Sequence, residues 1–249
     1  MSEFVTRGIV LREVNYKEAD KILTLLTPEG KVTAKARGVR RKGSRLAAAC
    51  QLLVYSELTL FSYRDYFTVN EASSLEQFWG VKEDLELVAL GSYFAQVCEC
   101  VAQEGVAQPE LLSLILNSLY ALDKLKLDPA KVKAAFELKA ACLAGYEPLL
   151  DACAVCGVEP SQPAFHLREG VLHCAACRKE VGEGISMPLT RGALAALRHV
   201  TYGDPKRLFS FTLDEESQSR FGDTCEAFLS TQLERGFHTL DFYKQMKLI

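Results

Sequence analysis

The sequence lacks any apolar segment of the length that crosses a bilayer, and its N-terminus lacks a basic stretch that leads into an apolar one. A membrane-spanning helix needs about 20 largely apolar residues in a row. A secretory signal peptide needs both of the N-terminal features. We therefore expect a soluble, cytoplasmic protein with no membrane partner.

Motifs of common nucleic-acid enzymes are also missing. The chain has no His-x-Glu deaminase pattern, no Gly-x4-Gly-Lys-Ser/Thr phosphate-binding loop and no Gly-x-Ser-x-Gly nucleophile elbow. Its acidic residues are scattered without a clear metal-binding group. The sequence therefore favours a binding protein over an enzyme, and magnesium-dependent hydrolysis or joining of DNA would indicate the enzyme class.

The chain has enough hydrophobic residues for a large core, and its charge is unevenly distributed along the sequence. The chain has a mass of 27.6 kDa and 49% hydrophobic residues, enough for one large or two modest domains. Residues 1–45 hold eleven Lys/Arg against five Asp/Glu, a net charge of +6. Because the whole chain has a net charge of −3, the remaining residues carry −9. Such segregation suggests that the basic part contacts nucleic acid.

Hydrophobic periodicity divides the chain into a β-rich start and a helical remainder. Strands are expected over 4–12, 21–27, 31–37, 52–62 and 66–74, and helices over 81–103, 109–125, 128–145, 190–200 and 217–237. Five short strands in about 75 residues favour a small barrel, for which the five-stranded OB fold is the natural candidate. We expect an α+β multidomain protein, with an OB-type barrel domain over 1–80 and a mostly α-helical domain over 81–249.

Positive charge is concentrated where the third expected strand ends. The segment from Lys31 to Arg45 contains seven cations and no carboxylate, and Gly38 and Gly43 indicate a turn within it. Such a loop binds a polyanion with little sequence preference, because neutralised phosphates release condensed counterions. The alternative is a solvated loop that only keeps the protein in solution. The cations are Lys31, Lys35, Arg37, Arg40, Arg41, Lys42 and Arg45.

Four of the nine cysteines form two Cys-x2-Cys pairs, Cys153 with Cys156 and Cys174 with Cys177, separated by seventeen residues. This spacing predicts one structural zinc ion per chain, bound by an element at about residues 150–180. Four thiolates leave no open coordination position, which argues against catalysis by the metal. Two vicinal disulfides or reduced thiols are the alternatives. We expect His166 and His173, in the connecting hairpin, to lie at its surface, although either can replace a cysteine as a ligand.

Two N-terminal segments form a distinctive pair: YKEADKILTLLTPEGK from Tyr16 to Lys31, and ARGVRRKGSR from Ala36 to Arg45. Together they resemble the N-terminal signature of the bacterial RecO family of recombination-repair proteins. The expected order of barrel, helices, four-cysteine element and further helices agrees with that family as well. The resemblance covers nearly the whole chain.

The resemblance implies a non-enzymatic DNA repair and recombination mediator. Proteins of this family bind single- and double-stranded DNA, anneal complementary strands and, with RecR, help RecA to load onto strands covered by single-strand-binding protein. A nucleoid-associated place in the bacterial cytoplasm follows. At the positions of this sequence that match the family motif, the resemblance implies that the DNA-facing residues are Lys21, Lys35, Arg37, Arg40, Arg41, Lys42 and Arg45. The motif carboxylates Glu18 and Asp20 would repel phosphate, so we expect them to fix the loop locally or to contact another protein.

Aromatic residues of the barrel can offer stacking faces for unpaired bases. The candidates are Tyr16, Tyr63, Tyr66 and Phe67. An RNA- or ribosome-associated factor is the alternative function, because a barrel with a zinc ribbon recurs there. An interaction adaptor is another, with Arg191, Arg198, Lys206 and Arg207 as cations for an acidic peptide or as ordinary exposed helix charges.

Overall fold

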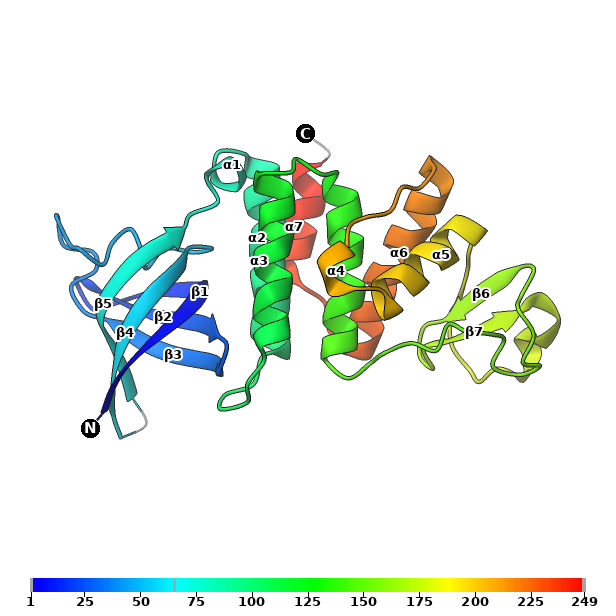
Figure 1. Cartoon of the computed structure of the whole chain (residues 1–249), viewed down its shortest axis with the longest axis horizontal. Coiled ribbons are helices and arrows are strands. Elements are labelled where there is room, and N and C mark those ends of the chain that lie inside the picture. The colour runs from blue at the N-terminus through cyan, green and yellow to red at the C-terminus, as the bar shows by residue number, and fades with distance from the viewer. Residues whose placement is uncertain (1, 65, 248–249) are drawn as a thin grey trace. The chain divides into compact units, whose positions relative to one another are not determined.

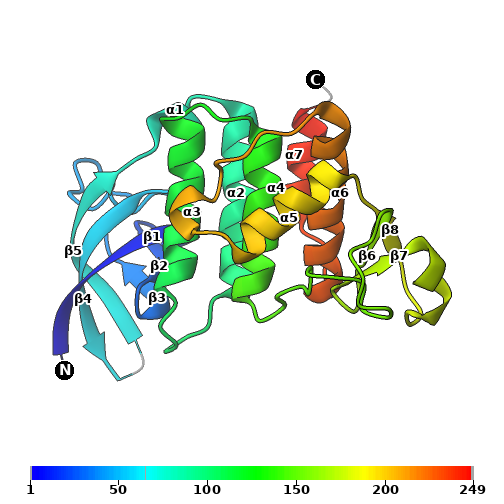
Figure 2. The same ribbon diagram turned by 45° about the vertical axis from the view of Figure 1, so that its right-hand side comes forward.

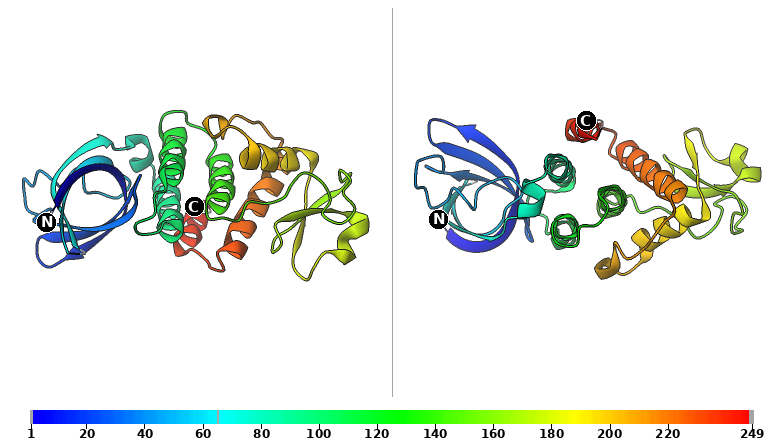
Figure 3. Two further views of the ribbon diagram at one scale, coloured as in Figure 1. Left: turned by 60° about the horizontal axis from the view of Figure 1, so that its bottom comes forward. Right: turned by 90° about the horizontal axis from the view of Figure 1, so that it is seen from above.

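Five strands close into a barrel in the computed structural model, which describes residues 2–64 and 66–247. The strands are β1 (Ser2–Tyr16), β2 (Asp20–Thr27), β3 (Gly30–Ala36), β4 (Tyr55–Tyr63) and β5 (Tyr66–Glu76). They follow the order β1-β2-β3-β5-β4, and antiparallel pairing of β1 with β4 completes the ring (Figure 3). The β3 and β5 strands pair in parallel through three residue pairs, whereas the other neighbours are antiparallel. The predicted OB-type barrel is confirmed.

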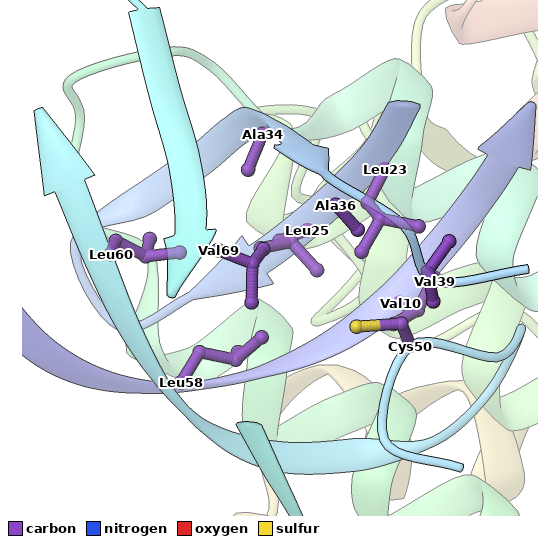
Figure 4. Packing of buried hydrophobic residues seen from close by; sticks show 10 residues of the cluster. All are labelled: Val10, Leu23, Leu25, Ala34, Ala36, Val39, Cys50, Leu58, Leu60 and Val69. Atoms are coloured by element: carbon purple, nitrogen blue, oxygen red, sulfur yellow. The ribbon is translucent and has the colours of Figure 1, made fainter. Parts of the chain in front are cut away.

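The barrel interior is filled by alternate residues of the strands and by the segment that connects β3 to β4. Leu23 and Leu25 of β2 point inward because the side-chain period of a strand is two. Val39 and Cys50 of the connecting segment pack beside Val10 of β1 at one end of this core (Figure 4). Burial of each large apolar side chain contributes about 1.5–3 kcal/mol. The connection between β3 and β4 is therefore held at both its ends by the barrel core.

Contacts divide the chain into two compact units, and the first is not continuous in sequence. It comprises Met1–Lys126 and Phe237–Ile249, while the second comprises Leu127–Gly236. The first unit adds to the barrel the helices α1 (Trp79–Lys82), α2 (Leu85–Val101), α3 (Pro109–Asp123) and α7 (His238–Met246) (Figure 1). The expected domain boundary between residues 80 and 81 stays a prediction.

Local sequence explains where these helices begin. The Asp84 side chain accepts a hydrogen bond from Leu87 N at 3.1 Å, which caps α2 and separates it from α1. Pro109 opens α3, since the first helical turn needs no N–H from it. The helix expected over 81–103 is therefore two helices, and the one expected over 109–125 is confirmed.

The expectation of one helix over 217–237 is wrong at its C-terminal end. Helix α6 (Glu215–Gln232) stops before Glu234, which has a left-handed φ of 51° and is followed by Gly236. The chain then enters α7, whose preceding residue Phe237 packs edge-on against Tyr93 of α2 at 5.6 Å between ring centroids. The left-handed turn at Glu234 ends α6, and the contact of Phe237 with Tyr93 holds the start of α7.

The second unit combines three helices with a small sheet. Its helices are α4 (Pro129–Leu143), α5 (Arg191–Tyr202) and α6, with the 3-10 turns η1 (Ala175–Glu180) and η2 (Pro205–Arg207). The sheet has the order β7-β6-β8, from Val171–Cys174, Pro163–His166 and Ser186–Pro188 (Figure 2). The hairpin of β6 and β7 was expected, whereas β8 was not. No helix in the described ranges has the length and apolar character needed to span a membrane.

A buried charge network joins α4 to α6 in this unit. Lys133 Nζ lies 2.8 Å from a carboxylate oxygen of Glu137 and 2.8 Å from one of Glu226. Burial alone would lower the pKa of Lys133, but the two carboxylates outweigh it and raise that pKa. The lysine is therefore charged when folded and compensates the completely buried Glu137.

Replacement of this lysine tests the network. We expect Lys133→Met to reduce the free energy of unfolding by about 3–5 kcal/mol, because Glu137 then becomes a buried charge without its cation. Lys206→Met is the matched control, since Lys206 is exposed and its change is expected to cost no more than about 0.5 kcal/mol. Urea denaturation of both variants supplies the measurement, and equal stabilities would contradict the assignment.

Candidate nucleic-acid interface and metal centre

The basic loop, residues 37–45, leaves the barrel at the end of β3. Its five cations are exposed, and within the described part of the chain none of them forms an ion pair with a carboxylate. They are Arg37, Arg40, Arg41, Lys42 and Arg45. A cation without a carboxylate partner can neutralise a phosphate without breaking an ion pair, and only the hydrogen bond from the Arg40 guanidinium to the Glu18 carbonyl oxygen is found among these side chains in the described structure. All five therefore remain candidates for contact with a polyanion.

The two other predicted DNA-contact residues have carboxylate partners. Lys21 Nζ lies 2.7 Å from Glu13 Oε2, and Lys35 Nζ lies 3.0 Å from Asp20 Oδ2. A phosphate that approaches either lysine meets a pair of no net charge rather than a lone cation. Their role in DNA contact stays a prediction. Because both lysines are paired, we expect them to attract phosphate less strongly than the cations of the basic loop do.

Asp20 also fixes the start of the basic loop, as expected for a local partner. Its Oδ1 accepts a hydrogen bond of 2.8 Å from the backbone N–H of Gly38. That N–H and the Lys35 ammonium hold the pKa of the Asp20 carboxyl below its ordinary value. Glu18 contributes through its backbone instead, because its carbonyl oxygen accepts from Arg40 Nη1 at 3.2 Å.

An aromatic groove of about 790 Å³ lies beside the basic loop on the barrel surface. It brings together three of the predicted aromatic residues, Tyr16, Tyr66 and Phe67, with Lys35 and Arg37. The other lining residues are Ile22, Thr33, Ala34, Phe61, Thr68 and Asn70. The side chain of the fourth predicted aromatic, Tyr63, is outside the described part of the structure.

The aromatic rings differ in how accessible they are. Tyr66 has 75% of its surface exposed. Phe67 packs edge-on against Phe4, with 5.9 Å between ring centroids. The ring of Tyr16 already has the Lys35 ammonium at 4.9 Å and a second lysine nearby. Tyr66 is therefore the groove residue best suited to stack on an unpaired base.

The four predicted metal ligands come together in the second unit. The sulfur atoms of Cys153, Cys156, Cys174 and Cys177 all lie within 4.8 Å of one another. A tetrahedral thiolate site with metal–sulfur bonds of about 2.3 Å has sulfur–sulfur edges of about 3.8 Å. The donor set and its spacing therefore fit a single metal ion.

Backbone geometry favours the thiolate form of one of the four cysteines, Cys153. Burial raises the pKa of Cys153, but the N–H groups of Cys156, Cys174 and Val155 directed at its sulfur outweigh this and lower its pKa to about 6. The N–H of Cys174 lies 3.4 Å from that sulfur. Metal binding requires deprotonated thiols, so a knuckle with amide groups directed at the sulfur lowers the cost of forming them.

The two hairpin histidines are buried, and the expectation that they lie at its surface is wrong. His166 is 1% exposed and His173 is inaccessible. His173 Nε2 lies 2.8 Å from Ser186 Oγ, and His166 Nε2 lies 3.1 Å from the carbonyl oxygen of Gly182. The rings thus join the hairpin to β8 and to the segment that precedes β8. The four cysteines alone form the cluster found among the described residues.

Helix α5 holds the cysteine element within the second unit. Arg198 donates to the carbonyl oxygen of Leu150 at 2.7 Å and that of Asp151 at 2.9 Å, and pairs with Glu159 at 2.8 Å. Tyr202 of the same helix donates to the carbonyl oxygen of Pro148. Arg198 is therefore occupied by internal contacts, which counts against its predicted role in an acidic-peptide site.

Two family models together match nearly the whole chain. Residues 1–78 match the family model described as "Recombination protein O N terminal", and residues 82–241 match "Recombination protein O C terminal". The chain belongs to the RecO family. This confirms the resemblance to the family, both in the N-terminal region that carries the motif and in the rest of the chain.

Curated members of the RecO family resemble the chain over their full length. The "DNA repair protein RecO" of Acetivibrio thermocellus is 34% identical over 100% of this chain and 99% of the relative. That of Symbiobacterium thermophilum is 34% identical over 99% of each. That of Caldicellulosiruptor saccharolyticus is 29% identical over 97% of this chain and 98% of the relative.

The sequence did not indicate every residue of the aromatic groove. Phe61 and Asn70 both line it with Tyr66 and were not among the predicted residues. Phe61 pairs with Thr68 across β4 and β5, so the alternation of strand residues was the available signal. This alternation alone does not locate the groove. The groove forms where β3 lies beside β5, and that pairing exists only in the closed barrel.

Proposed function

We propose that this chain is a non-enzymatic mediator of DNA repair and recombination, which binds single- and double-stranded DNA and anneals complementary strands. The observation that carries the proposal is the basic loop, with five exposed cations and no carboxylate partner among the described residues, next to an aromatic groove. Its DNA substrate places this activity at the nucleoid, in the bacterial cytoplasm. Membership in the RecO family supports the same assignment.

The basic loop supplies affinity without sequence selection. Each neutralised phosphate releases counterions, so binding weakens steeply as salt rises. Guanidinium groups at Arg37, Arg40, Arg41 and Arg45 have a fork geometry that suits phosphate oxygens. Because the phosphodiester chain is common to both DNA forms, the loop accepts single strands and duplexes alike.

The aromatic groove adds a contact that only an unpaired base can use. Base–aromatic stacking contributes about 1–3 kcal/mol per base and tolerates every base, since each has a π face. In a duplex the same faces are occupied by neighbouring base pairs. Tyr66 therefore favours single strands, while the basic loop does not distinguish them.

Annealing follows from charge neutralisation. Two complementary strands repel each other through their phosphates, and a cationic surface that binds both reduces this repulsion. Base pairing then needs no covalent step, so neither strand is cut. We further propose, from the family resemblance, that the chain acts with RecR on strands covered by single-strand-binding protein and thereby helps RecA to load.

The metal at the four-cysteine element is proposed to be zinc, one per chain, with a structural role. Zn²⁺ takes four thiolates in a closed tetrahedron, and four clustered sulfur atoms support this choice. A closed site leaves no position for substrate. It compensates for the small core of a three-stranded sheet of short strands.

The basic loop is tested by Arg40→Ala, Arg41→Ala and Lys42→Ala combined. Because this variant lacks three cations that neutralise phosphates, we expect the salt slope for single-stranded DNA to fall by about 2 and affinity at 50 mM salt to fall by a factor on the order of 100. Fluorescence anisotropy over a salt series gives both quantities. The control combines Lys206→Ala, Arg207→Ala and Arg220→Ala, which removes the same charge from other exposed sites. Equal effects in the two triple variants would remove the loop from the mechanism.

The groove is tested by Tyr66→Ala. We expect affinity for single-stranded DNA to fall about 5- to 150-fold, the equivalent of 1–3 kcal/mol, with the salt slope and duplex affinity unchanged. Tyr120→Ala serves as control, because Tyr120 is another exposed tyrosine of the first unit but lies on α3, outside the groove. A parallel loss of duplex binding would show that Tyr66 does not act by stacking. A preference for structured RNA in competition would favour an RNA-associated role.

The metal assignment is tested by elemental analysis and chelation. We expect about one zinc per chain, and we expect chelation under reducing conditions to raise amide exchange over residues 150–190 while the barrel strands stay protected. Cys177→Ser should lower the zinc content, whereas Cys100→Ser, on α2, should not. Zinc well below one per chain, with oxidised thiols in fresh protein, would contradict a closed site.

A further inference from the structure

A carboxylate lies within the proposed DNA-binding surface, where it should be unfavourable. Asp20 is the first residue of β2, beside Lys35 of the aromatic groove and Gly38 at the start of the basic loop. Simple Coulomb repulsion predicts that this carboxylate weakens the binding of phosphates. Its contacts indicate the opposite effect.

One carboxylate oxygen fixes the direction of the basic loop. Gly38 donates to Asp20 Oδ1 at 2.8 Å and has a left-handed φ of 64°, so the chain turns sharply at this bond. The backbone N–H of Arg40 donates to Ala19 O at 2.9 Å, and its guanidinium donates to Glu18 O. The base of the loop is thus tied to the turn between β1 and β2. Within the described structure, the backbone N–H groups of Lys42 and Gly43 at the tip form no such bond.

The other oxygen fixes a wall of the groove. Asp20 Oδ2 lies 3.0 Å from Lys35 Nζ, and this ammonium lies 4.9 Å from the centroid of the Tyr16 ring. Lys35 and Tyr16 both line the aromatic groove. A single carboxylate therefore contacts the backbone of the loop and a side chain of the groove at the same time.

We propose that Asp20 is a positioning residue for DNA binding, which presents the basic loop and the aromatic groove as one continuous surface. This inference rests on the proposed function. Pairing with Lys35 leaves the carboxylate with little net charge toward phosphate, so its repulsion is small. Ordering the loop before DNA arrives removes an entropy cost that binding would otherwise include.

Substitutions at Asp20 separate positioning from charge, because the two predict effects of opposite sign. The control is Glu71→Gln, which removes one negative charge from an exposed position of β5. By charge alone, both Asp20→Ala and the control should bind single-stranded DNA as tightly as the original protein or more tightly. Positioning predicts instead that Asp20→Ala binds at least about fivefold more weakly at about 100 mM salt, because the loop must then be ordered during binding.

A conservative variant supplies the rescue. In Asp20→Asn the amide oxygen can still accept from Gly38 N–H, so we expect it to recover affinity to within about threefold of the original protein. A purely electrostatic role would give Asp20→Asn and Asp20→Ala the same affinity. If Asp20→Ala equals Glu71→Gln while the unmodified protein binds DNA, this inference is overturned and the proposed function stands. If the unmodified protein does not bind DNA, the proposed function itself fails.

Amide exchange of the unmodified protein tests the proposal without any substitution, so the test does not depend on whether Asp20→Ala folds. By NMR we expect the Gly38 and Arg40 amides to exchange at least about tenfold more slowly than those of Lys42 and Gly43, because hydrogen bonds protect the first two. Equal exchange rates at the four positions would overturn the claim that Asp20 orders the base of the loop.

Discussion

Closure of the five-stranded barrel is the constraint on which the first unit depends. The β1 strand pairs with β2 on one side and with β4 on the other, so the sheet has no open edge there. The segment between β3 and β4 must then cross one end of the barrel. Val39 and Cys50 anchor it in the core, Leu46 packs against that core, and residues 40–43 and Arg45 are left exposed to solvent. The position of the basic loop is therefore a consequence of how the barrel closes.

The electrostatics of the barrel surface are divided between paired and unpaired cations. Lys21 and Lys35 lie on strands, where carboxylates on neighbouring chain segments reach them. Arg40, Arg41 and Lys42 lie on the loop, beyond the reach of such partners among the described residues. Carboxylate partners reduce the net charge that the two strand lysines present, whereas the charges of the loop cations are not compensated by carboxylates among the described residues.

In the second unit, the small three-stranded sheet is held in place by contacts outside its own strands. The sheet has short strands and too little apolar area for stability of its own. Three kinds of contact compensate: the four-cysteine cluster, the bonds of Arg198 and Tyr202 from α5, and the packing of Phe165 on Phe228 of α6. The metal element is thus attached to its own helices, and the buried Lys133 network ties two of the unit's helices together.

Sequence alone determined the strands of the barrel, most of the helices, the basic segment and the four-cysteine cluster, because these depend on local periodicity and short spacings. It did not separate α7 from α6, where the chain makes a left-handed turn at Glu234 and Phe237 then contacts Tyr93, which is distant in sequence. It also did not show that His166 and His173 are buried, or that Phe61 joins Tyr66 in a groove. Only the tertiary structure decided which cations are paired and which are available, because ion pairs form between residues that are distant along the chain and become neighbours only when the strands come together.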